Sequence, residues 1–222
     1  MKVIARIHTD FPTKFGIPRQ SGIIEALQGC IVFEPEYRNA EAVRGLEDFS
    51  HIWILWEFSE AVRDDWSPTV RPPRLGGNVR KGVFATRSPF RPNPIGLSSV
   101  RLEKVDFDTK LGPILYVSGA DLMDGTPIYD IKPYIAYTDS HPDAVSGFAS
   151  TPAEFLLDVV FPEQLLQKVD PSKREGLKAV LAHDPRPQYQ NDPERVYGME
   201  FSDMEVKFKV EGIQLKVLEV KL

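Results

Sequence analysis

Short runs of hydrophobic residues at strand spacing dominate the first two-thirds of the chain. Residues 2–9 (KVIARIHT) alternate apolar and polar side chains, and residues 50–59 (SHIWILWEFS) are typical of a strand buried on both faces or nearly so. Further strands are expected in segments separated by turn residues, which are 29–37, 81–88, 97–108 and 113–125. Residues 39–49 are expected to form one or two helical turns. Because few segments have helical periodicity, we expect a mainly β fold with a closed or nearly closed sheet.

The pattern changes after Tyr137. Residues 138–151 are polar and rich in turn residues, which is typical of a linker. Residues 162–170 and 171–184 each begin with proline, the favoured first residue of a helix, and place apolar residues at helical spacing. The segment that follows is expected to form a long β-hairpin turning near Glu211-Gly212. We therefore expect two domains, a β domain over 1–150 and a small α+β domain over 151–222.

The composition excludes several classes of site. A single cysteine, Cys30, among 222 residues rules out an intramolecular disulfide and a cysteine-rich zinc site. The four histidines are widely scattered and form no H-E-x-x-H motif, so no metal is expected. No apolar run reaches about 18 residues and no signal-peptide core is present, so we expect no membrane span and a cytoplasmic location.

The cations are unevenly distributed along a chain whose net charge is −5. Residues 67–102 contain no acidic side chain and seven cations, six of which are arginine. The planar guanidinium of arginine binds phosphate or carboxylate in a bidentate manner, so the segment favours a groove that follows an RNA backbone. The alternative is a solvated face whose counter-charges arrive from other segments on folding.

Residues 87–96 (RSPFRPNPIG) hold Arg87 and Arg91 in a stretch that contains three prolines. Proline fixes its own φ, lacks an N–H and favours extended geometry in the residue before it. We therefore expect a stiff, extended loop that presents two guanidinium groups to an anion.

An Asp-Gly turn within residues 119–133 is surrounded by the carboxylates of Asp121, Asp124 and Asp130. Ordinary turn chemistry with solvated carboxylates is one interpretation. The other is that Asp121 and Asp124 contact a ligand amine or remove a proton. The spacing of the oxygen ligands does not fit a calcium loop.

Two further segments have both a structural and a functional interpretation. The aromatic residues of 53–58 (WILWEF) are expected in the core, with ligand contact as the lesser alternative. The stiff loop 184–189 (DPRPQY) offers Arg186 and Tyr189 for phosphate contact and base stacking, or it is a helix stop followed by an irregular connection.

Six motifs spread over nearly the whole chain occur together: FGIPRQSG, RGLEDFSHIWILWEF, RPPRLGGN, GVFATRSPFRPNPIGLS, DLMDGTPIYDIKPY and LAHDPRP. With them the chain resembles the TsaA-like family, the bacterial tRNA methyltransferase O proteins. The resemblance implies a dimeric, S-adenosylmethionine-dependent enzyme that methylates N6 of threonylcarbamoyladenosine beside the anticodon of a threonine tRNA. It also implies a single-sheeted β-barrel, which agrees with the absence of a strand followed by G-x-G-x-x-G.

The same resemblance implies a cofactor pocket built from the motif positions. The implied residues are Pro18, Arg19, Gln20, Ser59, Glu60, Arg87, Leu97, Asp121, Leu122, Met123 and Asp124. Methyl transfer requires an acceptor nitrogen held in line behind the methyl group and a side chain that takes its proton. Asp124 is the first candidate for this catalytic role and Asp121 the second, in a chain that lacks the Asp-Pro-Pro-Tyr or Asn-Pro-Pro-Tyr motif of other adenine N6 methyltransferases.

The resemblance also implies that the basic segment contacts the tRNA. The implied RNA-binding residues are Arg71, Arg74, Arg80, Lys81, Arg91, Arg186 and Tyr189. An unstacked base of the anticodon loop is a kind of RNA target that proteins read, and a twofold homodimer doubles the basic area. The sequence also offers two other functions: a non-catalytic RNA-binding protein of the same fold, and a small-molecule hydrolase that uses the acidic turn.

Overall fold

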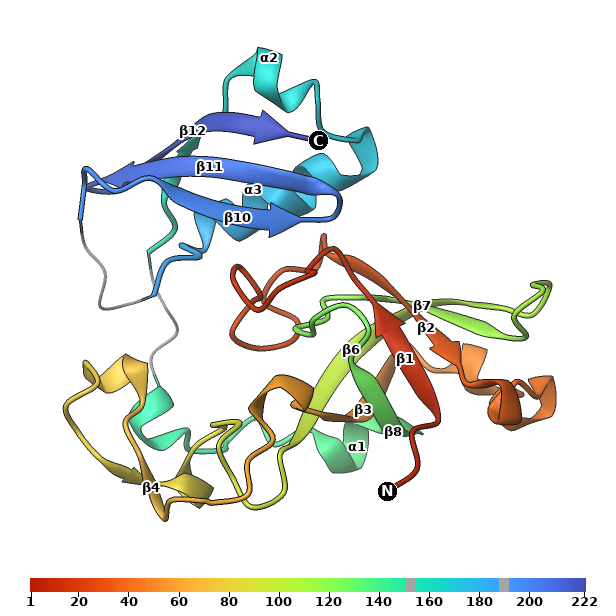
Figure 1. The fold of residues 1–222 in the computed structure, drawn as a ribbon. Helices are drawn as coiled ribbons and strands as arrows, with labels where there is room; N and C mark the ends of the chain where they lie inside the picture. The colour runs from red at the N-terminus through yellow and green to blue at the C-terminus, as the bar shows by residue number, and fades with distance from the viewer. Residues whose placement is uncertain (151–154, 188–191) are drawn as a thin grey trace.

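A closed six-stranded β-barrel forms the first part of the computed structural model, which describes residues 1–150, 155–187 and 192–222. The strands follow the spatial order β1-β2-β7-β6-β3-β8, and every neighbouring pair is antiparallel. Their bounds are Ala5–His8 (β1), Gln28–Phe33 (β2), His51–Glu57 (β3), Ile95–Asp106 (β6), Ile114–Ser118 (β7) and Pro127–Pro133 (β8). The barrel is visible in the lower half of Figure 1. The predicted mainly β fold with a single-sheeted barrel is confirmed.

Alternating side chains fill the interior of the barrel. In β3 the buried positions are Ile52, Ile54 and Trp56, and the residues between them are only half-buried. This differs from the expectation of a strand buried on nearly both faces. The outer side of Trp53 packs beside Tyr134, and its indole Nε1 donates a hydrogen bond to Asp139 Oδ2 at 2.9 Å. Each fully buried aliphatic side chain contributes about 1.5–3 kcal/mol to folding, so the alternation stabilises the closed sheet.

A long connection between β3 and β6, residues 58–94, projects from one end of the barrel (Figure 1, lower left). We call it the arginine loop. It contains the two-residue strands β4 (Thr69–Val70) and β5 (Lys81–Gly82), and the 3-10 turns η4 (Ser59–Ala61), η5 (Pro73–Leu75) and η6 (Val83–Ala85). The predicted strand over 81–88 is therefore reduced to two residues, because its only sheet partner is the equally short β4.

Short helical elements lie in the connections between the barrel strands and after β8. Residues 39–49 form two 3-10 turns, η2 (Ala40–Val43) and η3 (Leu46–Asp48), as the sequence predicted. They follow η1 (Pro35–Tyr37). After β8 come the short helix α1 (Ala136–Asp139) and η7 (Gly147–Ala149).

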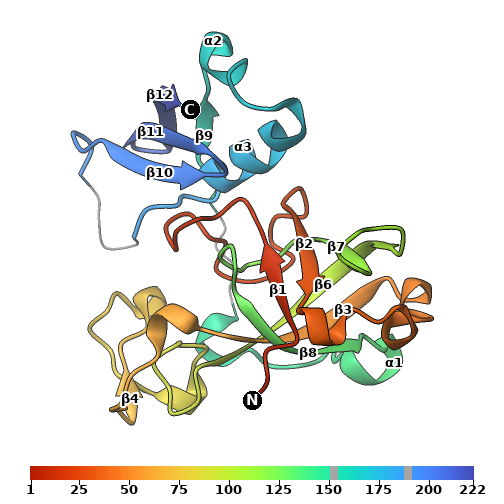
Figure 2. The ribbon, with the colours of Figure 1, turned by 45° about the vertical axis from the view of Figure 1, so that its right-hand side comes forward.

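A second sheet, with strand order β10-β11-β12-β9, lies above the barrel in Figures 1 and 2. The strands are Asp158–Val160 (β9), Tyr197–Phe201 (β10), Met204–Glu211 (β11) and Gln214–Lys221 (β12). The predicted hairpin is confirmed, since β11 and β12 pair from Glu211↔Gln214 onward around Gly212. Helices α2 (Glu163–Leu166) and α3 (Arg174–Ala182), with η8 (Pro171–Lys173) before α3, complete this unit.

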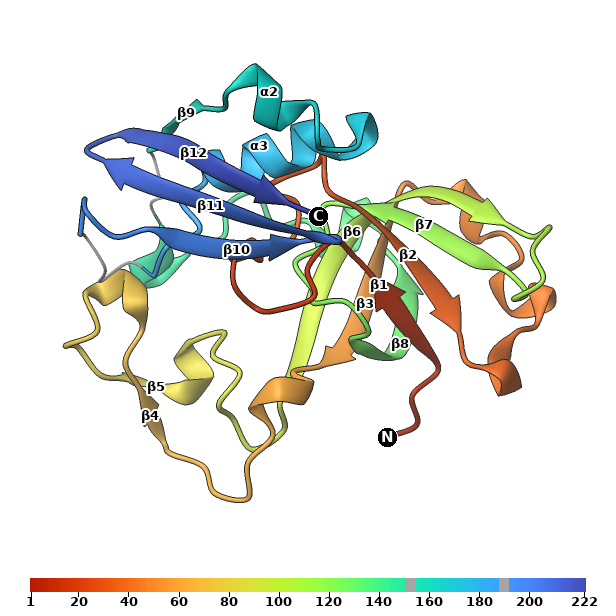
Figure 3. The ribbon, with the colours of Figure 1, turned by 45° about the horizontal axis from the view of Figure 1, so that its top comes forward.

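The second unit shares its core with the connection between β1 and β2, residues 9–27, which we call the β1–β2 loop. Phe11, Ile24 and Leu27 of this loop are buried in the same hydrophobic cluster as α3 and β10–β12. The rings of Phe11 and Phe201 pack edge to face, 5.6 Å between centroids. Figure 3 shows the loop beneath the second sheet. No helix in the described residues is long and apolar enough to cross a membrane.

Candidate active site

A pocket of about 910 Å³ opens at the end of the barrel where the arginine loop begins. Four segments line it: the β1–β2 loop, the end of β3 with the residues after it, the end of the arginine loop with the start of β6, and residues 121–126. This volume lies in the upper part of the range of small-molecule sites. The pocket is therefore large enough for a nucleoside-sized ligand together with part of a second reactant.

The barrel register explains why these segments meet. Trp56 pairs with Gly96 and Glu57 with Ile95, so the chain leaves β3 and enters β6 at the same edge. The pairing continues into the loop, where the Phe58 N–H donates to the Pro94 carbonyl at 2.8 Å. The β1–β2 loop joins this edge through a hydrogen bond from Gly22 N–H to the Gly119 carbonyl, also 2.8 Å. The pocket is thus built from segments far apart in sequence.

The indole of Trp56 lies flat against the backbone of Gly96. A Cβ at position 96 would lie 2.2 Å from the indole Cε2, so only glycine permits this contact. The indole Nε1 donates to Ser98 Oγ at 3.0 Å, and Ser98 Oγ donates to Asp121 Oδ1 at 2.6 Å. Ser98 is buried, so this series of hydrogen bonds fixes the carboxylate of Asp121 from behind the pocket wall.

Burial raises the pKa of the Asp121 carboxyl above its ordinary value. Hydrogen bonds from Ser98 and from the Ser21 backbone, together with the charge of Arg87, oppose this rise without cancelling it. A carboxylate that lines a pocket and whose pKa is raised is a stronger base, and so a better proton acceptor, than a fully solvated one.

Asp124 lies outside the pocket lining. Its Oδ1 lies 3.1 Å from His8 Nδ1 and accepts a hydrogen bond from the Thr9 N–H at 3.1 Å. Gly125, with φ of +74°, reverses the chain directly after it. The turn thereby directs the two carboxylates of DLMD to different neighbours, Asp121 to the pocket and Asp124 to the end of β1. This position does not favour Asp124, our first candidate from sequence, as the proton acceptor.

The structure brings the other predicted cofactor residues together. Each of them lines the pocket: Pro18, Arg19, Gln20, Ser59, Glu60, Arg87, Leu97, Asp121, Leu122 and Met123. Arg87 donates from Nη1 to Gln20 Oε1, which links the arginine loop to the β1–β2 loop across the pocket. The sequence did not identify Ser98, because nothing local distinguishes it from its strand neighbour Ser99.

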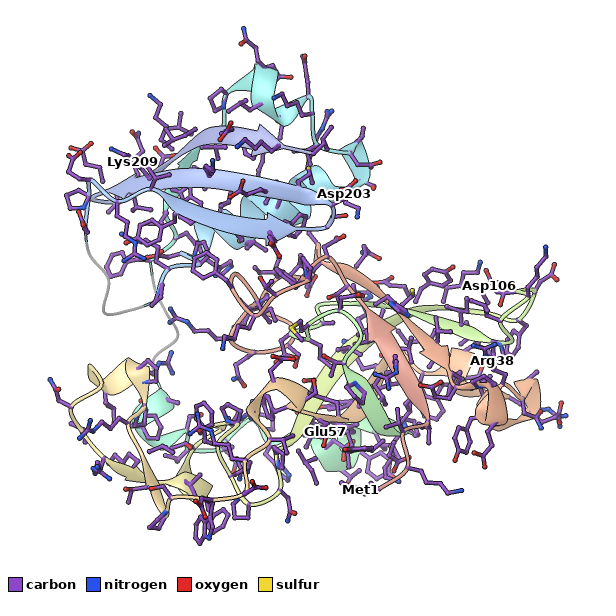
Figure 4. All side chains as sticks on the ribbon, viewed as in Figure 1. Met1, Arg38, Glu57, Asp106, Asp203 and Lys209 are labelled. Atoms are coloured by element: carbon purple, nitrogen blue, oxygen red, sulfur yellow. The ribbon has the colours of Figure 1, made fainter. Side chains whose placement is uncertain are left out.

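Pocket walls also come from residues that the sequence assigned to the core. Trp53, Trp56 and Phe58 line the pocket, and Trp56 is at the same time buried in the barrel core. Glu57, labelled in Figure 4, lines the pocket from the end of β3. Both interpretations of the WILWEF segment therefore apply, since one edge of an aromatic side chain can fill the core while the other faces the pocket.

The predicted RNA-binding residues fall into different environments. Arg71, Arg74 and Arg80 are exposed on the arginine loop, with Lys81 half-buried. No cation of this loop forms an ion pair with a carboxylate in the described part of the chain. The direct ion pairs with carboxylates that the solvated-face alternative would provide are therefore absent among the described residues.

Arg91 and Arg186 have other partners. Arg91 lines the pocket and donates from Nη1 to the carbonyls of Thr86 (3.2 Å) and Ser88 (3.4 Å), so it braces its own loop. Arg186 is only 9% exposed and forms a bidentate pair with Asp184, at 2.8 and 2.9 Å. The pair occupies Nε and Nη2, and Nη1 is buried, so the guanidinium is not accessible to a phosphate in this structure. Tyr189 lies outside the described residues.

No group of three or more histidine, cysteine, aspartate or glutamate side chains with metal-binding geometry occurs in the described segments. The acidic turn residues Asp124 and Asp130 instead contact protein partners, His8 and Lys132 respectively.

Comparisons with known proteins agree with this geometry. Residues 6–140 match the family model of the tRNA-methyltransferase O N-terminal domain, and residues 154–222 match that of the TrmO C-terminal domain. The chain is 41% identical to the tRNA (adenine(37)-N6)-methyltransferase of Escherichia coli K12 over 98% of this chain and 96% of that protein. It is 42% identical to RcsF of Pseudomonas aeruginosa, named provisionally as an S-adenosylmethionine-dependent methyltransferase, over 91% of this chain and 89% of that protein.

A solved structure also matches the whole chain. The crystal structure of TrmO from Pseudomonas aeruginosa superposes with a TM-score of 0.80 and 34% sequence identity, covering 100% of this chain and 97% of that one. The agreement extends over both units, the barrel and the smaller sheet. The chain therefore belongs to the tRNA-methyltransferase O family.

Proposed function

We propose that this protein transfers a methyl group from S-adenosylmethionine to N6 of adenine 37 in a tRNA. The observation that carries the proposal is the pocket of about 910 Å³, which combines arginine, carboxylate and aromatic side chains at the base of a cation-rich loop. The names of the relatives supply the substrate position and the methyl donor.

The lining residues fit the proposed cofactor chemically. Its amino-acid end is a zwitterion, for which Arg19 and Arg87 offer cations, while Glu57 and Glu60 offer anions. Its adenine requires apolar walls, which Trp53, Phe58 and Leu122 are placed to supply. When bound, S-adenosylmethionine supplies an electrophilic methyl group on a sulfonium.

The chain's own residues then have two tasks. The first is to hold the acceptor nitrogen in line with the methyl group, which is a matter of proximity and orientation. The second is to take the proton that N6 releases as its bond to the methyl carbon forms and the carbon–sulfur bond breaks. We assign this second task to Asp121, whose carboxylate is oriented by Ser98 and whose pKa is raised by burial.

The finer specificity follows from the family resemblance. We propose that the acceptor adenine carries the threonylcarbamoyl group, that the tRNA is a threonine tRNA, and that the protein acts as a homodimer in the cytoplasm. The exposed cations Arg71, Arg74 and Arg80, with Lys81, are proposed to follow the phosphates of the anticodon loop.

Methylation of total tRNA with a labelled methyl donor tests the proposed function. Nucleoside analysis by mass spectrometry is expected to show one new methylated product, derived from threonylcarbamoyladenosine. Isothermal titration with S-adenosylmethionine is expected to show binding by the free protein. If the folded protein binds tRNA but does not bind S-adenosylmethionine and does not transfer a methyl group, it is instead a non-catalytic RNA-binding protein.

Asp121→Asn is expected to reduce kcat by about 100- to 10,000-fold, because the amide cannot accept the proton. It preserves an oxygen for the hydrogen bond from Ser98. Asp124→Asn is the matched control from the same turn and is expected to change kcat by less than about threefold, since Asp124 lies outside the lining. A larger loss in Asp124→Asn than in Asp121→Asn would reverse the assignment.

A further inference from the structure

Large aromatic side chains are exposed on the arginine loop, which also carries exposed cations. Phe84 is 70% exposed and Trp66 is 53% exposed, and neither belongs to either hydrophobic core cluster. Their ring centroids are 6.1 Å apart. Exposed aromatic side chains that cluster on a stiff loop are typical of a recognition surface.

This pair of rings is connected to the pocket. Arg91, which lines the pocket, places its guanidinium carbon 6.0 Å from the centre of the Phe84 ring. Phe90 also lines the pocket, and the guanidinium carbon of Arg63 lies 4.0 Å from the centre of its ring. Because Arg63 covers Phe90, the more open rings are those of Phe84 and Trp66. We call Phe84 and Trp66 the aromatic pair.

We propose that the aromatic pair stacks against unpaired bases of the RNA that flank the methylated adenine. Every base has a π-face, so stacking on an aromatic ring binds single-stranded RNA without reading its sequence. Exposed cations of the same loop, such as Arg71 and Arg80, would neutralise the phosphates that run between the stacked bases. This inference rests on the proposed function, since it names how the same site holds its RNA.

The charges of the loop favour RNA over a second copy of the chain as the occupant. In a twofold interface the same patch meets itself, so the exposed guanidinium groups of the loop would face one another. The carboxylates of the loop, Glu60, Asp64 and Asp65, all precede Trp66 in sequence. From Trp66 to the end of the loop, at residue 94, all charges are positive, which is complementary to phosphate.

The loop is also prepared for binding in conformational terms. Several of its groups form hydrogen bonds within the protein: Arg80 Nη1 donates to Thr69 Oγ1 at 2.8 Å, and the Val83 N–H donates to the Pro68 carbonyl at 3.0 Å. Arg74 Nη1 donates to the Ala149 carbonyl at 3.1 Å, which ties the loop to the segment after α1. A platform that is already ordered loses little conformational entropy when a base stacks on it.

The test measures binding of a fluorescently labelled anticodon stem-loop RNA by anisotropy over a range of salt concentrations. Phe84→Ala and Trp66→Ala are each expected to weaken binding by about 5- to 100-fold. The slope of log Kd against log salt should stay unchanged, because no cation is lost. Phe84→Tyr keeps a ring and is expected to retain most of the affinity.

Phe107→Ala is the matched control. Phe107 is 44% exposed, but it lies in the turn between β6 and β7, next to the labelled Asp106 in Figure 4 and far from the arginine loop. Its removal is expected to leave the affinity for RNA unchanged. An equal loss in Phe107→Ala and Phe84→Ala would indicate a general effect on the protein and overturn the proposal.

Abasic nucleotides identify the group that stacks. An abasic substitution at the contacted loop position is expected to weaken binding to the unsubstituted protein, and to have little further effect on Phe84→Ala or Trp66→Ala. If, at every loop position, the effects of the abasic substitution and of the aromatic variant on the binding free energy simply add, that result would overturn the proposal. So would an affinity unchanged in both aromatic variants while the unsubstituted protein binds and methylates the RNA, a result that leaves the proposed function standing.

Two further outcomes separate the remaining explanations. If the unsubstituted protein neither binds nor methylates the stem-loop, both the proposed function and the stacking are overturned. If Phe84→Ala dissociates an oligomer, as measured by light scattering, while leaving RNA affinity unchanged, the aromatic pair is a subunit contact and the proposal is wrong.

Discussion

Asp121 shows how a single residue acquires chemistry from its surroundings. Asp121 and Asp124 belong to one turn and are equally acidic in sequence, yet only Asp121 lines the pocket. The difference comes from Ser98, which is held by Trp56 and donates to Asp121. It also comes from His8 and the Thr9 backbone, which hold Asp124. Burial then disfavours the charged form of Asp121, so the group that is suited to catalysis also destabilises the folded state at neutral pH.

Asp121→Asn is expected to raise the melting temperature at neutral pH. The pKa of Asp121 is higher in the folded than in the unfolded state, where it is near 3.8. The stability that the protonated carboxyl contributes is therefore fully present below the unfolded-state pKa and is lost as pH rises through the folded-state pKa. Each kcal/mol gained in the free energy of unfolding raises the melting temperature by about 2–4 °C in a chain of this size. Thermal unfolding from pH 4 to pH 8 checks this: the gain should shrink toward pH 4, and a gain independent of pH would contradict it.

The β1–β2 loop connects the core of the second unit with the pocket of the barrel. Its Phe11, Ile24 and Leu27 belong to the core of the second unit, while its Pro18, Arg19 and Gln20 line the pocket. Gly16, between Phe11 and Pro18 in sequence, has φ of +92°. It approaches the side chain of Met199 so closely that a Cβ would lie 2.3 Å from the Met199 sulfur. The second unit therefore anchors a loop that serves the first.

Phe201→Ala is expected to weaken S-adenosylmethionine binding by about 3- to 10-fold beyond its effect on stability. The substitution removes the edge-to-face partner of Phe11 and loosens the loop that carries Pro18 to Gln20. Both binding and unfolding are measured below the melting temperature of the variant, by titration and by calorimetry.

Phe208→Ala is the control for this prediction. Phe208 is buried in the same core, but its ring partner is Tyr197 and not a residue of the β1–β2 loop. A large-to-small change in a core costs about 3–5 kcal/mol in either variant. Equal weakening of cofactor binding in the two variants would show that the loop is not specifically anchored by Phe201.

At the scale of the whole molecule, positive charge is concentrated on the arginine loop of a protein that is negatively charged overall. The net charge is −5, yet the arginine loop presents cations without ion-pair partners among the described carboxylates. Such a local field attracts a polyanion to one end of the barrel, while the remaining surface repels it. We expect this arrangement to orient a bound tRNA with respect to the pocket.

Arg71→Ala is expected to weaken tRNA binding and to reduce the slope of log Kd against log salt by about one unit, as for one lost phosphate contact. The matched control is Lys110→Ala, an exposed cation in the turn between β6 and β7, for which no change of slope is expected. Binding titrations at several salt concentrations measure both variants. An unaltered slope in Arg71→Ala would favour the solvated-face interpretation of the loop.

Much of this protein was decided by local sequence. Alternation of apolar and polar residues is sufficient to specify strands and an inward face, so the barrel, the β11–β12 hairpin and the turns of 39–49 were predictable. The prolines of residues 87–96 restrict the backbone wherever the segment lies, and the density of arginine between 67 and 102 is visible without a fold. The family motifs identified many of the residues that line the pocket.

Tertiary structure alone decided which groups are free to act. His8 and Asp124 are 116 positions apart in the chain, and their contact is what holds Asp124 away from the pocket. Arg186 appeared available in sequence, but folding buried it against Asp184. The β1–β2 loop lies in the first half of the chain and packs in the core of the last third. Burial and pairing depend on contacts between distant residues, and no local pattern encodes them.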